Sequence, residues 1–221
     1  VWKSNSRRPE SHRLSSTQCG LPELQAAQRP DEQRCVVYSF GSRGDDLFER
    51  RVLQLAPGCE VHIFDRSAPV RPAPRGGSGP YARTARYHCR YLTADNASSL
   101  STYMRQLGHD YLDVLKVDIE GTEWDVFPGI DWPRARIGQI QVEIHPARPR
   151  STVGHVDALF ATLETAGYRV ISIEPVGFPP SDAGSQPVEA VFLHRAWTPW
   201  GFARSGRAAS GKLAPPHSPY F

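Results

Sequence analysis

The chain has 221 residues, enough for one sizeable core, and its 39% hydrophobic and 22% charged residues are typical of globular domains. A net charge of +3 is too small to indicate a nucleic-acid-binding protein, and no apolar run approaches the roughly 20 residues that span a bilayer. We therefore expect a soluble chain with three parts: an irregular lead-in over 1–33, a domain over 34–196 and an irregular tail over 197–221.

The lead-in has room for one short helix around Leu21–Gln28, and the predicted domain begins after it. Short runs of β-branched and aromatic residues predict strands, in chain order Cys35–Phe40, Glu60–Asp65, Arg86–Leu92, Leu112–Ile119, Ile137–Ile144, Arg169–Glu174 and Glu189–His194. Helical periodicity predicts helices from about Asp45 to Pro57, over Leu100–Leu107, and from about Val156 to Gly167.

Strands that alternate with helices predict an α/β fold with a doubly wound, mostly parallel sheet. The last two predicted strands are joined by a loop rich in proline, glycine and serine rather than by a helix. One antiparallel edge strand is therefore expected.

In such a sheet, ligands bind beyond the carboxyl ends of the strands. The first strand runs into Gly41-Ser42-Arg43-Gly44, where two glycines allow backbone N–H groups to approach a ligand. The second strand ends at Asp65, about 21 residues after Gly44, near the offset at which an acid binds a ribose hydroxyl pair. Together they indicate a nucleoside ligand, either a nicotinamide dinucleotide or S-adenosylmethionine. An ordinary turn and a solvated aspartate are the alternatives.

Two further pairs of polar residues follow buried strands. Asp118 and Glu120 come after LDVLKV, and buried acids need cations, backbone donors or a ligand. Glu143 and His145 end the next strand and could accept a proton from a substrate hydroxyl or bind a metal. Helix capping by the first pair and a structural role for the second are the alternatives.

The four cysteines, Cys19, Cys35, Cys59 and Cys89, lack CxxC pairing and zinc-ligand spacing, so we expect no structural zinc site and assign no metal ligands. Cys19 and Cys35 could form a disulfide in an oxidising compartment. Free buried thiols would suit Cys35 and Cys89 equally well.

Two stretches carry a resemblance to a known family. DVLKVDIEGTEWDVFPGI resembles the hallmark segment of FkbM-type methyltransferases, and CVVYSFGSRGDDLFE with GCEVHIFD is similar to their animal methyltransferase-like protein 24 branch. The resemblance covers roughly Cys35 to Arg195. It implies a seven-stranded Rossmann-like fold and methyl transfer from S-adenosylmethionine, usually to oxygen.

The resemblance also implies roles for individual residues. It assigns Gly41 to Gly44, including Ser42, to the amino-acid end of the cofactor, Asp65 to its ribose, and Asp118 with Glu120 to the region near the sulfonium. Where the family commonly has an acid, two residues before the first glycine, this chain has Ser39.

The hypothesis is therefore an S-adenosylmethionine-dependent methyltransferase whose acceptor is a small molecule, a glycan or a protein. Orientation of the acceptor or acceptance of its proton is assigned to a group of four side chains: Asp118, Glu120, Glu143 and His145. The resemblance favours secretion, and a cytoplasmic location stays open. One rival is a degenerate methyltransferase fold that binds a partner without turnover, as Ser39 suggests. Another is a nicotinamide-dependent oxidoreductase, although a full GxGxxG is missing.

Overall fold

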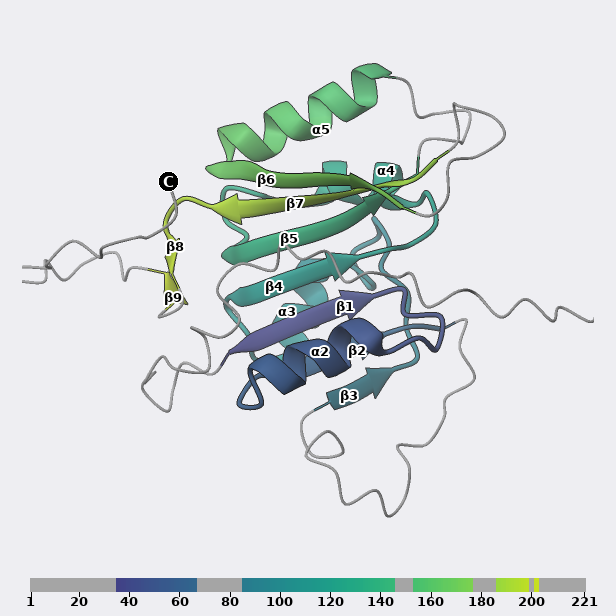
Figure 1. Ribbon diagram of the computed structural model, residues 1–221, viewed down its shortest axis with the longest axis vertical. Coiled ribbons are helices and arrows are strands. Elements are labelled where there is room, and N and C mark those ends of the chain that lie inside the picture. Colours follow the sequence, from purple (N-terminus) through teal and green to yellow (C-terminus); the bar gives the residue numbers. More distant parts are fainter. Residues whose placement is uncertain (1–34, 67–84, 146–152, 177–185, 199–200, 203–221) are drawn as a thin grey trace, which may run out of the picture.

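The computed structural model describes residues 35–66, 85–145, 153–176, 186–198 and 201–202 (Figure 1). The short helix predicted around Leu21–Gln28 and the cysteine at position 19 lie outside these ranges.

Seven strands form one sheet in the order β3-β2-β1-β4-β5-β7-β6 (Figure 1). Their bounds are β1 Val36–Phe40, β2 Glu60–Phe64, β3 Ala85–His88, β4 Leu112–Val117, β5 Ile137–Ile144, β6 Tyr168–Pro175 and β7 Val188–His194. The first five pair in parallel, whereas β7 runs antiparallel to both β5 and β6. The predicted mostly parallel α/β sheet is confirmed, with the antiparallel strand one place inside the edge strand β6.

Helices cover both faces of this sheet. The described helices are α2 Leu47–Leu55, α3 Leu100–Leu107, α4 Glu123–Val126, the short 3-10 turn η2 Phe127–Gly129, and α5 Val153–Thr165. Figure 1 shows α2 in front of the sheet and α3 behind it. Side chains of β1 alternate between two cores: Val37 packs with α2, while Tyr38 and Phe40 pack with α3. None of the described helices is both long and apolar enough to cross a bilayer.

The chain continues past residue 196 in contact with the sheet. Trp197 begins β8 (Trp197–Thr198), which pairs with β9 (Gly201–Phe202). Its indole is buried and Nε1 donates to Oδ1 of the fully buried Asp113 at 3.0 Å. The domain boundary at 196 stays a prediction, and the packing of this indole extends at least one residue beyond it.

A disulfide joins Cys35 to Cys59. The predicted partner for Cys35 was therefore wrong, as was its alternative as a free thiol, and Cys89 is free but exposed rather than buried. The physical reason is the register of β1 on β2, which sets Val36 opposite Glu60 and so brings the two preceding cysteines together.

Removing this disulfide is expected to destabilise the fold by about 3 kcal/mol, because the bond closes a 24-residue separation and restrains the unfolded chain. Urea unfolding of the Cys35→Ser/Cys59→Ser double variant measures the loss. Cys89→Ser, which removes an exposed free thiol, is the control and should change little. Equal midpoints for wild type and double variant would show that the bond adds no stability.

Candidate functional site

A cavity of about 450 Å³ opens at the carboxyl ends of β1, β2 and β4. The strand order reverses here, since β1 lies between β2 and β4, and such switch points are where open α/β sheets bind ligands. The predicted residues that line it are Gly41, Asp65, Asp118 and Glu120. Residues from strands far apart in the sequence thus meet at one site.

Gly41 holds three strand ends together. Its φ is +86°, and its N–H donates to the carbonyl of Phe64 at 3.0 Å. A Cβ at this position would stand 1.6 Å from the carbonyl oxygen of Asp118. No side chain fits at that distance, so glycine is required both for its backbone conformation and for the close approach to the end of β4.

Asp65 also lines the cavity and is 8% exposed. Its Oδ2 accepts a hydrogen bond from Ser42 Oγ at 3.2 Å and another from the backbone N–H of Arg43. Ser42 therefore supports the acid and does not itself line the cavity. Gly44 has a φ of +81° in the exposed turn and is likewise absent from the lining.

Ser39 does not reach the cavity. It is fully buried beneath α2, beside Glu49, a residue that the sequence analysis did not select. Neither side chain makes a hydrogen bond of regular geometry within the described residues. Burial raises the pKa of Glu49, while the charge of Lys116 and the Ser39 hydroxyl lower it. The fold thus places a carboxyl group beside Ser39, where the family commonly has an acid.

Four carboxylates surround His145. Its Nε2 lies 3.4 Å from Glu143, 3.8 Å from Glu120 and 3.9 Å from Asp118. Its Nδ1 lies 3.1 Å from Oε1 of Glu123, which also accepts the N–H of residue 119 at 3.0 Å. The predicted acids and histidine therefore form one cluster, which adjoins the cavity through Asp118 and Glu120.

The packing of this cluster determines the protonation states of His145 and Asp118. Burial lowers the pKa of His145, but hydrogen bonds to Glu123 and Glu143, and their charges, raise it to about 10. Burial also raises the pKa of Asp118 to about 6, although Lys116 at 3.7 Å opposes the rise. At neutral pH His145 is thus a cation that holds carboxylates together, and Asp118 is ionised but close to its titration range.

The segment after β3 forms the rest of the cavity wall. The strand predicted over Arg86–Leu92 ends at His88, and the residues that follow it line the cavity instead of pairing in the sheet. Tyr91 and Leu92 then line the cavity, with the Tyr91 carbonyl accepting the hydroxyl of Tyr103 at 2.5 Å. This wall was missed, although the rule that ligands bind beyond strand ends would have included it.

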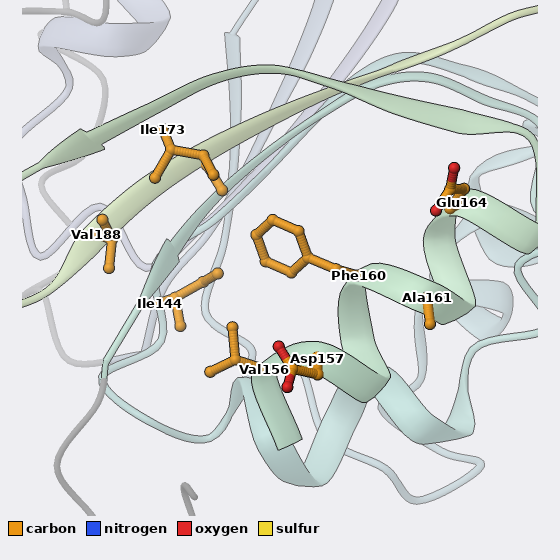
Figure 2. A pocket seen from close by; sticks show the side chains of 9 residues that line it. Ile144, Val156, Asp157, Phe160, Ala161, Glu164, Ile173 and Val188 are labelled. Atoms are coloured by element: carbon orange, nitrogen blue, oxygen red, sulfur yellow. The ribbon is translucent and has the colours of Figure 1, made fainter. Parts of the chain in front are cut away.

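A second cavity, of about 490 Å³, lies between α5 and strands β5, β6 and β7 (Figure 2). Phe160 points from the helix toward Ile144 and Ile173, and the lining is largely apolar. It contains none of the residues that the sequence analysis selected. The first cavity, with convergent polar groups that include Asp118 with its raised pKa, is therefore the candidate active site.

Comparison with known families agrees with this geometry. A family model described as a methyltransferase domain matches residues 10–181, which is most of the chain. The chain belongs to the methyltransferase domain family. The expectation of a methyltransferase is thereby confirmed, and the relatives below support its animal branch.

The methyltransferase domain is 33% identical over 127 residues to probable methyltransferase-like protein 24 of Rattus norvegicus, covering 51% of this chain and 33% of that protein. It is 30% identical over 144 residues to the Homo sapiens protein of the same name, covering 57% and 37%. The match thus spans about a third of each relative's length.

Among solved structures, the fibrillarin pre-rRNA processing protein of Methanococcus jannaschii superposes with a TM-score of 0.45 at 13% identity, covering 73% of this chain and 66% of that one. This likeness concerns general architecture alone.

Proposed function

We propose that this methyltransferase domain binds S-adenosylmethionine in the cavity between Gly41 and Asp65 and transfers its methyl group to an oxygen of an acceptor. The observation that carries the proposal is the cradle itself: the backbone at Gly41 and the largely buried carboxylate of Asp65 both line the cavity. A carboxylate there suits a ribose hydroxyl pair. Tyr91 and Leu92, which also line the cavity, suit a flat, largely apolar ring.

The charge of the site also suits this cofactor. The sulfonium of S-adenosylmethionine is a cation, and Asp118 and Glu120 line the cavity with carboxylates. Glu120 is paired with the guanidinium of Arg43, whereas Asp118 lies 3.7 Å from Lys116 with its Oδ1 buried and without a hydrogen bond to described residues. Both carboxylates already lie near cations, Glu120 near Arg43 and Asp118 near Lys116 and His145, and a bound sulfonium would share their negative charge.

The kind of base that the site offers supports an oxygen acceptor. A hydroxyl is a weak nucleophile until a base takes its proton. His145 is protonated at neutral pH and cannot accept a proton, so we assign this role to Asp118 or Glu143. Methyl transfer from sulfur otherwise needs mainly an in-line approach, which fixed strand ends favour.

We also propose that the protein is secreted and that its methyltransferase domain is of the FkbM type. The Cys35–Cys59 disulfide supports an oxidising compartment, because such bonds are rare where thiols are kept reduced. Mass spectrometry of the alkylated protein, purified from its native source, tests this: two unmodified cysteines linked in one peptide pair support it, and a fully alkylated chain contradicts it.

Asp65→Asn is expected to weaken S-adenosylmethionine binding about 10- to 100-fold, since hydrogen bonds to a charged acceptor are worth about 1.5–3 kcal/mol each. Isothermal titration calorimetry measures the change. Ser42→Ala, which removes one of the two hydrogen bonds to this acid and the Ser42 hydroxyl that accepts the Gly44 N–H, is the matched control and should weaken binding less. Absence of wild-type binding at millimolar cofactor would remove the proposal, and tighter binding of a nicotinamide dinucleotide would favour the oxidoreductase.

A degenerate methyltransferase fold remains the second candidate, because Ser39 stands where the family commonly has an acid. Release of S-adenosylhomocysteine across a broad panel of hydroxylated acceptors separates the two. Cofactor binding without any release would favour the binding protein.

A further inference from the structure

We propose that Glu60, His62 and His109 form a binding site for a divalent transition-metal ion of the zinc type. Glu60 begins β2, about 16 Å along the strand from Asp65 in the candidate active site, and His62 lies two residues further along, about 10 Å from it. The site is independent of the proposed methyl transfer, and the sequence analysis assigned no metal ligands there.

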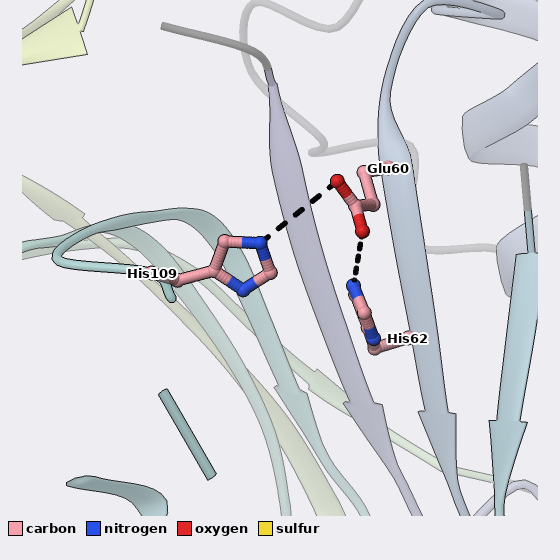
Figure 3. A group of neighbouring side chains, drawn as sticks. All are labelled: Glu60, His62 and His109. Atoms are coloured by element: carbon pink, nitrogen blue, oxygen red, sulfur yellow. Dashed lines mark hydrogen bonds and ion pairs between the residues drawn. The ribbon is translucent and has the colours of Figure 1, made fainter. Parts of the chain in front are cut away.

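The three side chains converge from two elements that are far apart in the sequence (Figure 3). Glu60 and His62 are two apart on β2, so they share one face of the strand. His109 comes from the turn after α3, where Gly108 takes the left-handed conformation and the N–H of His109 bonds the carbonyl of Met104 at 2.8 Å. Backbone hydrogen bonding therefore fixes all three positions before any ion arrives.

Their ligand atoms have the spacing that a tetrahedral ion needs. The carboxylate lies 2.9 Å from Nε2 of His62 and 3.9 Å from Nε2 of His109, and all three ligand atoms lie within 4.8 Å of one another. Zinc–nitrogen bonds of 2.0–2.1 Å separate neighbouring ligands by about 3.4 Å. The observed separations of 2.9 and 3.9 Å lie on either side of that value.

Hydrogen-bond partners outside this group of three hold both imidazoles with Nε2 toward Glu60. Nδ1 of His62 lies 2.9 Å from Nε2 of His88, and Nδ1 of His109 lies 2.7 Å from the hydroxyl of Tyr38. With each Nδ1 carrying the proton and donating it, each Nε2 presents a lone pair to the ion. Such outer hydrogen bonds are characteristic of histidines that bind metals.

Two imidazoles and one carboxylate favour zinc and similar ions over magnesium or calcium, which prefer oxygen ligands alone. The site is also reachable, because Glu60 and His109 are partly exposed while His62 is fully buried. One feature opposes binding: the exposed guanidinium of Arg86 lies 3.0 Å from the same carboxylate. Removal of the Arg86 guanidinium is therefore expected to strengthen binding of the metal ion.

Calorimetric titration of the full, tag-free, chelator-treated chain with zinc chloride tests the proposal. We expect one strong site per chain, weakened about 100-fold in Glu60→Gln and in His109→Gln, and tightened severalfold in Arg86→Gln. Titration with cobalt chloride should give the intense visible absorption of a four-coordinate site in wild type and not in His109→Gln. Circular dichroism confirms that each variant is folded.

Two controls address the other histidines. His155→Ala removes an exposed imidazole on α5, and His145→Gln removes the imidazole of the second group that could hold an ion, with Asp118 and Glu143. Both should bind zinc as wild type does. Binding that survives in folded His109→Gln, binding that is lost in either control, or no binding at millimolar zinc would each overturn the proposal. Should His109→Gln unfold, unchanged affinity in Arg86→Gln together with absent cobalt absorption in wild type would overturn it as well.

Discussion

Gly41→Ala is expected to abolish S-adenosylmethionine binding and to destabilise the fold by more than about 3 kcal/mol. The new methyl group would stand 1.6 Å from the carbonyl oxygen of Asp118, which is backbone and cannot rotate aside. Relief requires β1 and β4 to separate where the cavity opens. Urea unfolding and calorimetric titration with the cofactor measure the two losses.

Gly108→Ala is the matched control, because this glycine has a similar φ of +76° but nothing within 4 Å of an added Cβ. It isolates the cost of the left-handed conformation, about 1 kcal/mol, from the cost of the clash. If the two variants lost equal stability, or if Gly41→Ala bound the cofactor normally, the close contact between the strand ends would have no role in the site.

The candidate site could be predicted largely from positions within the chain. Gly41, Asp65 and Asp118 each follow an apolar run, and parallel strands bring their carboxyl ends to one edge whatever the details of packing. The residues at that edge can therefore be identified from the sequence alone. The protonation state of His145 could not be predicted in this way. His145 is a cation because Glu123, on a short helix after β4, lies 3.1 Å away, and no spacing rule predicts that contact.

Features that depend on pairing register or on long-range contacts were missed. The disulfide between Cys35 and Cys59 needs β1 and β2 to be aligned as neighbours, and from the sequence only Cys19 was considered as a partner for Cys35. The group of Glu60, His62 and His109 likewise needs the turn after α3 to reach β2. Such contacts arise from tertiary packing, which the local periodicity of a strand or helix does not encode.

Asp118→Asn is expected to remove a pH dependence from cofactor binding. Burial raises the pKa of this carboxyl to about 6, so the group is protonated and neutral below that pH and ionised above it. S-adenosylmethionine carries a sulfonium cation, whereas S-adenosylhomocysteine has a neutral sulfur. The wild type should therefore bind the methylated cofactor increasingly well, relative to the demethylated product, as the pH rises from 5 to 7, by about tenfold. The variant should show a constant ratio.

The free energy of unfolding distinguishes the loss of this pH dependence from damage to the fold. A carboxyl whose pKa is raised from its ordinary 3.8 contributes stability that is full below pH 3.8 and is lost as the pH rises through about 6, because ionisation is costly where the group is buried. Asp118→Asn should therefore be at least as stable as wild type at pH 7 while binding S-adenosylmethionine less tightly. A variant that was both less stable and unchanged in its pH profile would contradict the role assigned to Asp118. A more stable variant with weakened cofactor binding would mean that this chain sacrifices fold stability to keep a carboxylate facing the sulfonium.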